Sequence, residues 1–194
     1  MNKKLAILLW DFSLGGLQNR MQYLVEHQSI IENKLEVFVI LFEKKFPERS
    51  LLKSKYIKKV YFPGYESFKL GKWISKLPLG KFFLRCLWLF RFLIDKRLTH
   101  VLSYSNQLSL VASLAIIFSR LFLNYKIKFV IAEAILLSNH IRFKQRWFWK
   151  YLSRFPYFFV SQVIVATEIE KDDLAENFGV SLKKIKVIRN WIQL

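Results

Sequence analysis

Cysteine, histidine and acidic residues are scarce in this sequence. The single cysteine, Cys86, excludes an internal disulfide, and no second cysteine or neighbouring histidine suggests a structural zinc site. A reducing compartment and a protein without a bound metal are therefore predicted.

Long uninterrupted apolar runs are also missing. The N-terminal run Leu5–Trp10 has six apolar residues, fewer than the roughly 7–15 that form the core of a signal peptide. The longest uncharged stretch, Leu98–Ser119, contains nine Ser, Thr, Asn, Gln or His residues, whereas a membrane-spanning helix needs about 20 predominantly apolar residues. A buried strand is predicted for the first run, a strand and an amphipathic helix for the second, and no transmembrane segment.

Because acids are few, the charge is strongly positive. There are 32 Lys and Arg residues against 14 Asp and Glu, a formal net charge of +18, and 17% of the residues are aromatic. This combination indicates an anionic partner that is also contacted by aromatic rings, which is typical of a membrane surface or of nucleic acid.

Apolar runs alternate with segments of helical periodicity along the chain. Lys4–Trp10 is closed by Asp11 and Gly15-Gly16, as expected for a parallel strand covered on both faces. Further strands are predicted at Leu35–Phe42, Lys58–Phe62, Val101–Tyr104, Lys128–Glu133, Gln162–Ala166 and Lys186–Ile188, and helices at Leu17–Ile31, within Ser67–Arg97, and at Gln107–Phe122, Arg142–Arg154 and Glu168–Phe178. This order predicts one Rossmann-like α/β domain with a mostly parallel sheet and helices on both faces.

The loop after the first strand is the first candidate for ligand binding, because such sheets bind ligands beyond the carboxyl ends of their strands. Gly15 and Gly16 let the backbone approach a ligand, and the N-terminus of the next helix favours a phosphate. The third glycine and the downstream acid of a dinucleotide fingerprint are missing. Taken alone, a Gly-Gly pair is more often an ordinary turn.

Several segments, in the same order, resemble the N-terminal domain of the family 4 retaining glycosyltransferases of GT-B fold. They are Lys4–Trp10 with Gly15–Arg20, Thr99–Asn106, Lys128–Glu133, Val163–Thr167, Phe178–Val180 and Lys184–Asn190. The closing segment keeps the Asn190 and Ile192 of a typical linker to a second domain, whereas Trp191 and Gln193 depart from the usual Gly and Asp. The resemblance implies that residues 1–188 form the N-terminal domain, that residues 189–194 begin the interdomain linker, and that the donor-binding domain is absent.

The resemblance also implies an activity. A hexosyl group would be transferred from a nucleotide-diphosphate sugar with retention of configuration and without a metal or cofactor. The amides of Gly15 and Gly16 would face the donor diphosphate, and Ser105 and Asn106 would lie on the acceptor side. Because the donor domain would lie outside this chain, the chain alone is expected to be inactive.

Two residues are candidates for a catalytic or sugar contact. Glu133 ends a predicted strand, and His140 is the histidine nearest to the loop where family members often carry one. Each has an alternative role: Glu133 as a structural hydrogen-bond acceptor, and His140 as a solvated loop residue.

Two stripes of cations and aromatic rings predict a membrane-binding surface. They are Lys81, Arg85, Trp88, Phe92 and Lys96, and Arg142, Arg146, Trp147, Lys150 and Arg154. Cations meet anionic headgroups and rings settle at the bilayer boundary, whereas no nucleic-acid motif accompanies the charge. The sequence therefore predicts a cytoplasmic enzyme, peripheral on the inner face of the cell membrane, that acts on a lipid-linked or membrane-resident acceptor in capsule or lipopolysaccharide synthesis. A non-catalytic membrane-binding subunit of a split enzyme, recruited beside a separate donor-binding chain, is the alternative.

Overall fold

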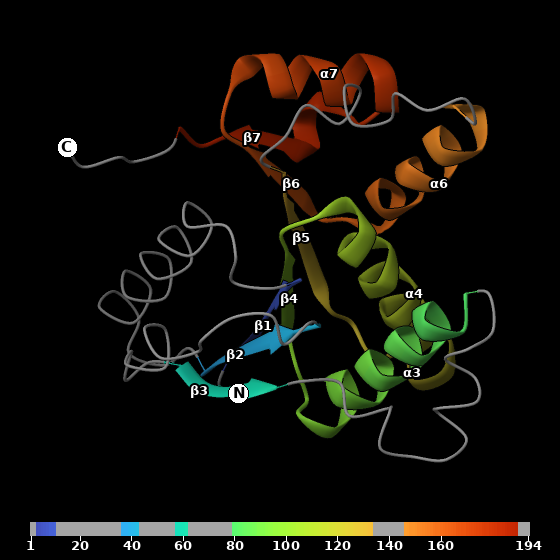
Figure 1. Cartoon of the computed structure of the whole chain (residues 1–194). Helices are drawn as coiled ribbons and strands as arrows, with labels where there is room; N and C mark the ends of the chain where they lie inside the picture. Colours follow the sequence, from blue (N-terminus) through green and yellow to red (C-terminus); the bar gives the residue numbers. More distant parts are fainter. Residues whose placement is uncertain (1–2, 11–35, 43–56, 62–78, 134–145, 190–194) are drawn as a thin grey trace.

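The computed structural model describes residues 3–10, 36–42, 57–61, 79–133 and 146–189, with only the backbone for 57–61 and 146–150 (Figure 1). In this part of the chain, seven parallel strands form one sheet in the order β3-β2-β1-β4-β5-β6-β7. They are β1 (Lys4–Leu9), β2 (Glu36–Leu41), β3 (Ile57–Tyr61), β4 (His100–Ser103), β5 (Lys128–Ala132), β6 (Gln162–Val165) and β7 (Ile185–Val187). The predicted Rossmann-like α/β fold is confirmed.

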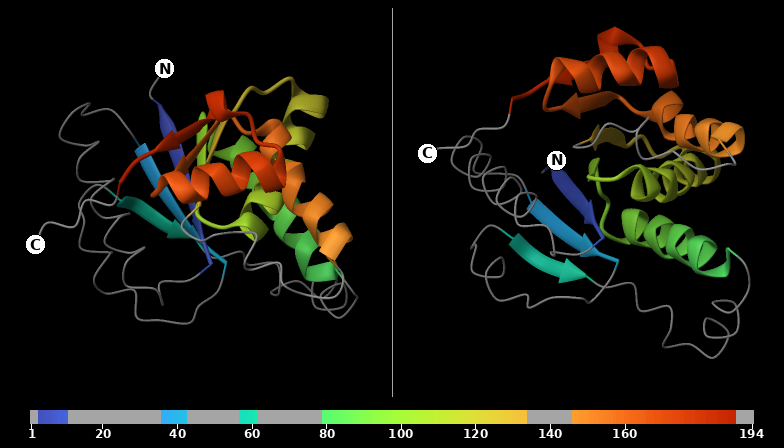
Figure 2. Two further views of the ribbon diagram at one scale, coloured as in Figure 1. Left: turned by 90° about the horizontal axis from the view of Figure 1, so that it is seen from above. Right: turned by 45° about the horizontal axis from the view of Figure 1, so that its top comes forward.

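Three of the described helices pack side by side on the sheet. They are α3 (Gly80–Asp95), α4 (Asn106–Leu123) and α6 (Arg146–Phe159), with α4 in contact with both neighbours (Figure 2). The helix α7 (Glu168–Phe178) lies beside β6 and β7, and a short 3-10 helix, η3 (Leu182–Lys184), leads into β7. The predicted helix Leu17–Ile31 lies outside the described residues.

The core lies between the sheet and this helical layer. β1 pairs with β2 on one side and β4 on the other, and its residues Ala6, Ile7 and Leu8 are fully buried. Leu89 of α3 and Phe129 of β5 are also fully buried. Burial of the strand on both sides explains why β1 is continuously apolar and does not alternate.

The helix α4 has a capping residue at each end. The Ser105 hydroxyl accepts a hydrogen bond from the Leu108 N–H at 3.3 Å, and Asn124 ends the helix in the left-handed conformation with φ 48°. By length and composition α4 could cross a membrane, but 44% of it is buried in the domain. A core helix meets the same criterion, and α4 packs into the core of the domain through Leu108, Val111 and Ala112.

The helix α6 extends beyond its predicted end. The predicted helix ends at Arg154, two residues before Pro156, and proline lacks the N–H that an interior helical position donates. In the structure the helix continues to Phe159 with Pro156 inside it. The continuation brings Tyr157 and Val160 into the core, where they are 5% and 3% exposed, and this burial opposes the loss of one helical hydrogen bond.

Candidate functional site

The carboxyl edge of the sheet holds the candidate site. The chain leaves β1 for β2 on one side and later returns to β4 on the other, so the strand order reverses between β1 and β4. In open α/β sheets, ligands bind in the crevice at this switch point. Trp10 follows β1 directly, and Tyr104 and Ser105 follow β4. Gly15, Gly16 and His140 lie outside the described residues, so their predicted roles stay predictions.

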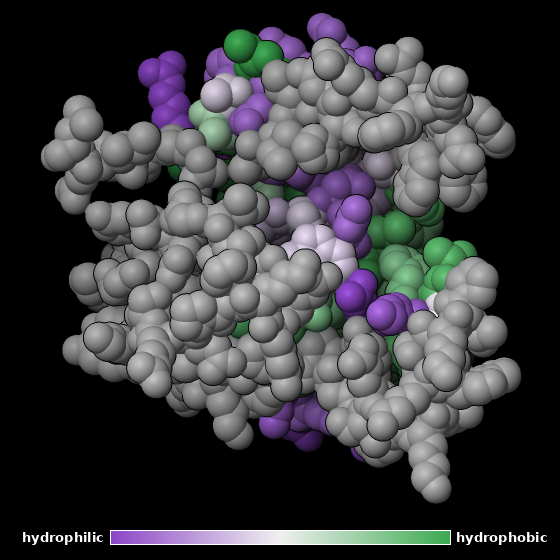
Figure 3. Space-filling model, viewed as in Figure 1, coloured by the Kyte–Doolittle hydropathy of each residue, from purple (hydrophilic) through white to green (hydrophobic). Residues whose placement is uncertain are grey.

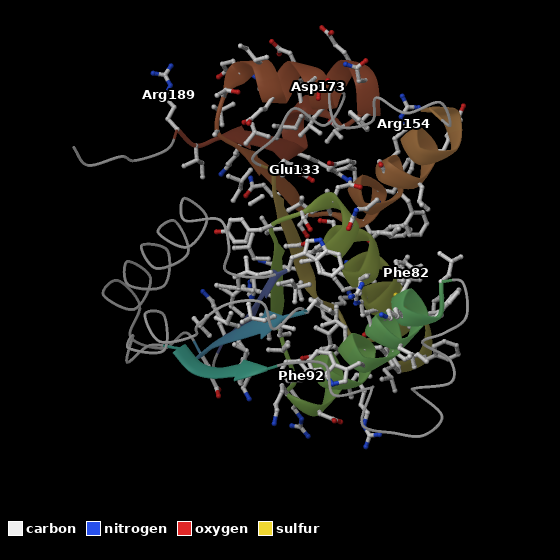
Figure 4. The ribbon with its side chains drawn as sticks, in the orientation of Figure 1. Phe82, Phe92, Glu133, Arg154, Asp173 and Arg189 are labelled. Carbon is white, nitrogen blue, oxygen red and sulfur yellow. The ribbon has the colours of Figure 1, made fainter. Side chains whose placement is uncertain are left out.

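Glu133 follows β5 and is held by a residue that the sequence reasoning missed. The Tyr157 hydroxyl, from α6, donates a hydrogen bond to Glu133 Oε1 at 3.0 Å, and both side chains are buried (Figure 4). Tyr157 comes after Pro156, beyond the predicted end of the helix, and the aromatic residues of this segment offered no signal that singled it out. Of the two roles left open for Glu133, the structure shows that of a structural acceptor, and a sugar contact stays a prediction.

Burial changes the acidity of this pair. Removal from water raises the pKa of Glu133 from 4.5 to about 7, with the Tyr157 hydrogen bond opposing the change and nearby Glu170 adding to it. Burial and the neighbouring Glu133 also hold the pKa of Tyr157 well above its usual value. Glu133 is therefore a carboxyl group that exchanges its proton near neutral pH.

The acceptor-side candidates Ser105 and Asn106 each make a hydrogen bond within the fold. Ser105 caps α4, and the Asn106 amide donates to the Ser153 carbonyl of α6 at 3.1 Å. A hydrogen bond from the Asn106 side chain also lowers the pKa of Tyr157, which links Asn106 to the Glu133 pair. These contacts fix the two side chains at the carboxyl edge, while contact with an acceptor stays a prediction.

The first predicted membrane stripe is wrong for Phe92. Phe92 is 7% exposed and lies edge-on to Phe38 of β2, at 6.2 Å between ring centroids (Figure 4). Trp88 stacks on Phe92 at 5.0 Å and contacts Phe42, so it is partly buried against the core. These large rings pack against the sheet because burial removes their apolar surface from water. Of the rest of the stripe, Lys81 is exposed, and Arg85 and Lys96 are partly buried.

The Arg85 guanidinium lies over the ring of Trp10, the residue that follows β1. Its guanidinium carbon lies 4.5 Å from the centroid of the Trp10 ring, a cation–π geometry. Sequence periodicity placed Arg85 correctly on the same face as Trp88 and Phe92, but α3 carries aromatic residues all around, so periodicity alone did not show that this face meets the sheet.

The second predicted stripe is described only in part. Arg142 lies outside the described residues, and for Arg146, Trp147 and Lys150 only the α6 backbone is described. The Arg154 guanidinium donates to the Asn177 carbonyl at 2.9 Å, which ties α6 to the end of α7. Membrane binding by this stripe stays a prediction.

The acids near the edge are engaged in helix α7. Glu170 accepts from the Ala166 and Thr167 N–H groups at 2.7 and 3.0 Å and completes a capping box with Thr167, and Asp173 accepts from Asn177 at 2.8 Å. Within the described ranges, no group of three or more His, Cys, Asp or Glu side chains is arranged to hold a metal ion.

A parallel sheet with polar groups gathered at its switch point defines an α/β domain of the doubly wound class. The sequence profile of Glycosyltransferase Family 4 matches residues 14–194. The chain belongs to that family, as its resemblance predicted.

Solved structures share this fold at low sequence identity. The apo form of the lipopolysaccharide outer core galactosyltransferase WaaB is 15% identical, with a TM-score of 0.67 over 98% of this chain and 46% of that one. HepE from Anabaena, in complex with UDP and glucose, is 14% identical, with a TM-score of 0.67 over 98% of this chain and 45% of that one. A search of curated proteins finds no match.

A UDP-GlcNAc 2-epimerase from Methanocaldococcus jannaschii shares the fold as well. It is 15% identical, with a TM-score of 0.60 over 95% of this chain and 45% of that one. The fold therefore does not by itself select the reaction. The chain spans less than half the length of each of these three structures.

Proposed function

We propose that the chain is the acceptor-side part of a glycosyltransferase that moves a hexosyl group from a nucleotide-diphosphate sugar to a membrane-resident acceptor. The match to Glycosyltransferase Family 4 over residues 14–194 carries the proposal. One structural neighbour is a lipopolysaccharide outer core galactosyltransferase and another is in complex with UDP and glucose, which supports it. The proposed setting is capsule or lipopolysaccharide synthesis at the inner face of the cell membrane, with retention of configuration and no metal or cofactor.

The proposed site needs a second wall. The chain corresponds to less than half of its structural neighbours, so we propose that a donor-binding part, in the same protein or a separate one, closes over the carboxyl edge. The amides of Gly15 and Gly16 would then stabilise charge on the leaving diphosphate. The Ser105 hydroxyl, which accepts from the Leu108 N–H, keeps its own proton to donate to an acceptor. The chain alone would be inactive.

The exposed side chains of α3 and α4 support membrane docking through a surface other than the predicted stripe. Leu79, which directly precedes α3, and Phe83 and Leu87 on it recur every four residues and are 69%, 55% and 57% exposed. At the end of α4, Leu121 and Phe122 are 73% and 71% exposed. Figure 3 shows apolar side chains gathered over α4 and the adjoining part of α3. We call these five residues the α3–α4 apolar surface.

The positive charge around the α3–α4 apolar surface favours an anionic partner. Between residues 79 and 132 the sequence has eight Lys or Arg residues and one acid, Asp95. Arg120, which is exposed, directly precedes Leu121 and Phe122. Apolar groups next to unbalanced positive charge fit an anionic bilayer, where rings enter the boundary and cations meet headgroups.

Vesicle binding tests the docking surface. The chain should pellet with phosphatidylserine-containing vesicles, and less so as salt is raised from about 0.1 M to about 1 M, which shortens the Debye length from about 10 Å to about 3 Å. Phe122→Ser should weaken binding about tenfold or more, since a buried Phe contributes about 1.5–3 kcal/mol. Leu182→Ser is the matched control because Leu182 is 56% exposed on η3. Equal loss in both variants, or preference for single-stranded DNA over vesicles, contradicts the proposal.

A transfer assay decides between an enzyme and the non-catalytic alternative. The chain, together with any protein encoded by the adjoining DNA, is incubated with radiolabelled nucleotide-diphosphate sugars and a membrane lipid extract. Label should move to the lipid phase, and Gly16→Val should abolish the transfer without changing vesicle binding. Vesicle binding with no transfer from any donor would favour a membrane-binding subunit.

A further inference from the structure

In the described part of the protein, no acidic side chain pairs with the Arg85 guanidinium. Within those residues, no hydrogen bond or ion pair reaches its guanidinium group, and its Nε is buried without a partner. The contact that the structure gives it is the face of the Trp10 ring, at 4.5 Å. An aromatic face attracts a cation but accepts no conventional hydrogen bond, so the ring leaves the remaining guanidinium donors available to water or to a ligand.

A buried arginine Nε without a partner occurs twice in the described residues, at Arg85 and at Arg154, but Arg154 also donates from another nitrogen to the Asn177 carbonyl at 2.9 Å. Arg91, on the same helix, pairs with Asp95 at 3.6 Å, and Arg120 donates to the Ile127 carbonyl at 3.2 Å. Both are exposed, whereas Arg85 is partly buried. Buried polar groups normally have partners, and a planar fork of donors is the preferred partner of a phosphate or carboxylate.

The position of Arg85 indicates where such a partner would come from. Trp10 is the first residue after β1, at the switch point where sheets of this class bind ligands. Lys81, one turn before Arg85 on α3, adds a second, exposed cation. Phe42 lies edge-on to the Trp10 ring at 6.1 Å and to Trp88 at 6.4 Å, so further aromatic rings continue from the ring that the cation contacts.

We propose that Arg85, held against Trp10, binds a phosphate oxyanion whose ester group lies against the neighbouring aromatic rings. This inference rests on the proposed function for the source of the phosphate. Two sources share the chemistry: the diphosphate of a nucleotide-sugar donor, and the phosphate of a lipid-linked acceptor.

Direct binding to the 194-residue chain tests the site without any transfer reaction. Isothermal titration calorimetry is run with two probes, UDP for the donor and geranyl phosphate for the acceptor, with geraniol as the uncharged control. Arg85→Met should weaken binding of at least one phosphate probe about tenfold or more, the usual effect of losing a charge-assisted hydrogen bond. Arg91→Met removes an equal charge from the same helix and should leave the affinity unchanged.

A stability measurement separates ligand binding from a structural role. Because the guanidinium lacks partners, Arg85→Met should leave the urea midpoint unchanged or raise it. If the variant unfolds more easily, Arg85→Lys decides: it should weaken binding severalfold while Arg91→Lys does not. The proposal is overturned if Arg85→Met binds both probes as the wild type does, if Arg91→Met weakens binding equally, or if Arg85→Lys and Arg91→Lys bind alike.

The two probes identify the source, and the assay stands apart from the proposed function. Dependence of geranyl phosphate binding on Arg85, without competition from UDP, assigns the site to the acceptor, and dependence of UDP binding assigns it to the donor. If the wild type binds neither probe, the site is refuted while the transfer assay is unaffected. If transfer fails but Arg85-dependent binding holds, the site stands and the proposed function does not.

Discussion

Replacing Glu133 by Gln should change how the stability of the fold depends on pH. The Gln side chain has nearly the same shape and keeps an oxygen that accepts the hydrogen bond from the Tyr157 hydroxyl, which is 3.0 Å from Glu133 Oε1. Unlike Glu, Gln has no carboxyl group that gains or loses a proton. Any difference between the two proteins that varies with pH therefore reports the ionisation of Glu133.

The expected size follows from the raised pKa. The pKa of Glu133 is 4.5 when unperturbed and about 7 in the fold. Below pH 4.5 Glu133 is protonated in both the folded and the unfolded chain, so its ionisation does not reduce the free energy of unfolding there. Between 4.5 and 7 the folded chain binds more protons, so stability falls as the pH rises. At about 1.4 kcal/mol per pKa unit, the loss reaches about 3 kcal/mol above pH 7.

Urea unfolding at several pH values measures this loss. The wild type and Glu133→Gln are compared at about pH 4.5, 6, 7 and 8, with the free energy of unfolding obtained by linear extrapolation. The variant should gain about 3 kcal/mol relative to the wild type between pH 4.5 and pH 8. Glu176→Gln, which changes an exposed carboxylate on α7, is the control and should show no such gain. A constant difference between wild type and Glu133→Gln at all pH values would refute the reasoning.

Three further predictions concern the helices around the core. Ser105→Ala should lower the free energy of unfolding by about 1 kcal/mol, measured by urea titration, because it removes the cap of α4. Gly179→Ala should lower it by about 1–2 kcal/mol in the same assay, because Gly179 ends α7 at φ 67° and an added Cβ meets no atom, so the cost is conformational. Burial raises the pKa of Cys86 to about 12, so the folded chain should not react with a thiol reagent at about pH 8, whereas the chain unfolded in urea should react fully.

The arrangement of strands and helices was largely predictable because each element carries its own signal. The apolar run Lys4–Trp10 corresponds to β1, and the predicted helix Glu168–Phe178 has the same bounds as α7. In α7 the local chemistry marks both ends, with Thr167 and Glu170 forming the capping box and Gly179 adopting positive φ. The end of α6 was missed because burial of Tyr157 outweighs the local effect of Pro156, and burial is set by contacts distant in sequence.

The candidate site was predictable only in outline. The strand order placed Ser105, Asn106 and Glu133 at the carboxyl edge, and the structure has them there. Their partners were not predictable, because the Tyr157 bond to Glu133 spans 24 residues and the Asn106 bond to Ser153 spans 47. The inward face of α3 was misjudged for the same reason, since Phe38 and Phe42, which cover it, come from another part of the chain.

Two polar groups at the carboxyl edge reduce the stability of an otherwise apolar core. The Glu133 carboxyl group is buried with a raised pKa, and the Arg85 Nε is buried without a partner. Elsewhere, the residues that surround β1 bury apolar side chains completely. The Glu133 carboxyl group has a partner in the Tyr157 hydroxyl, whereas the Arg85 guanidinium lacks one at the edge where such sheets bind ligands, which is the basis for proposing a phosphate at Arg85 alone.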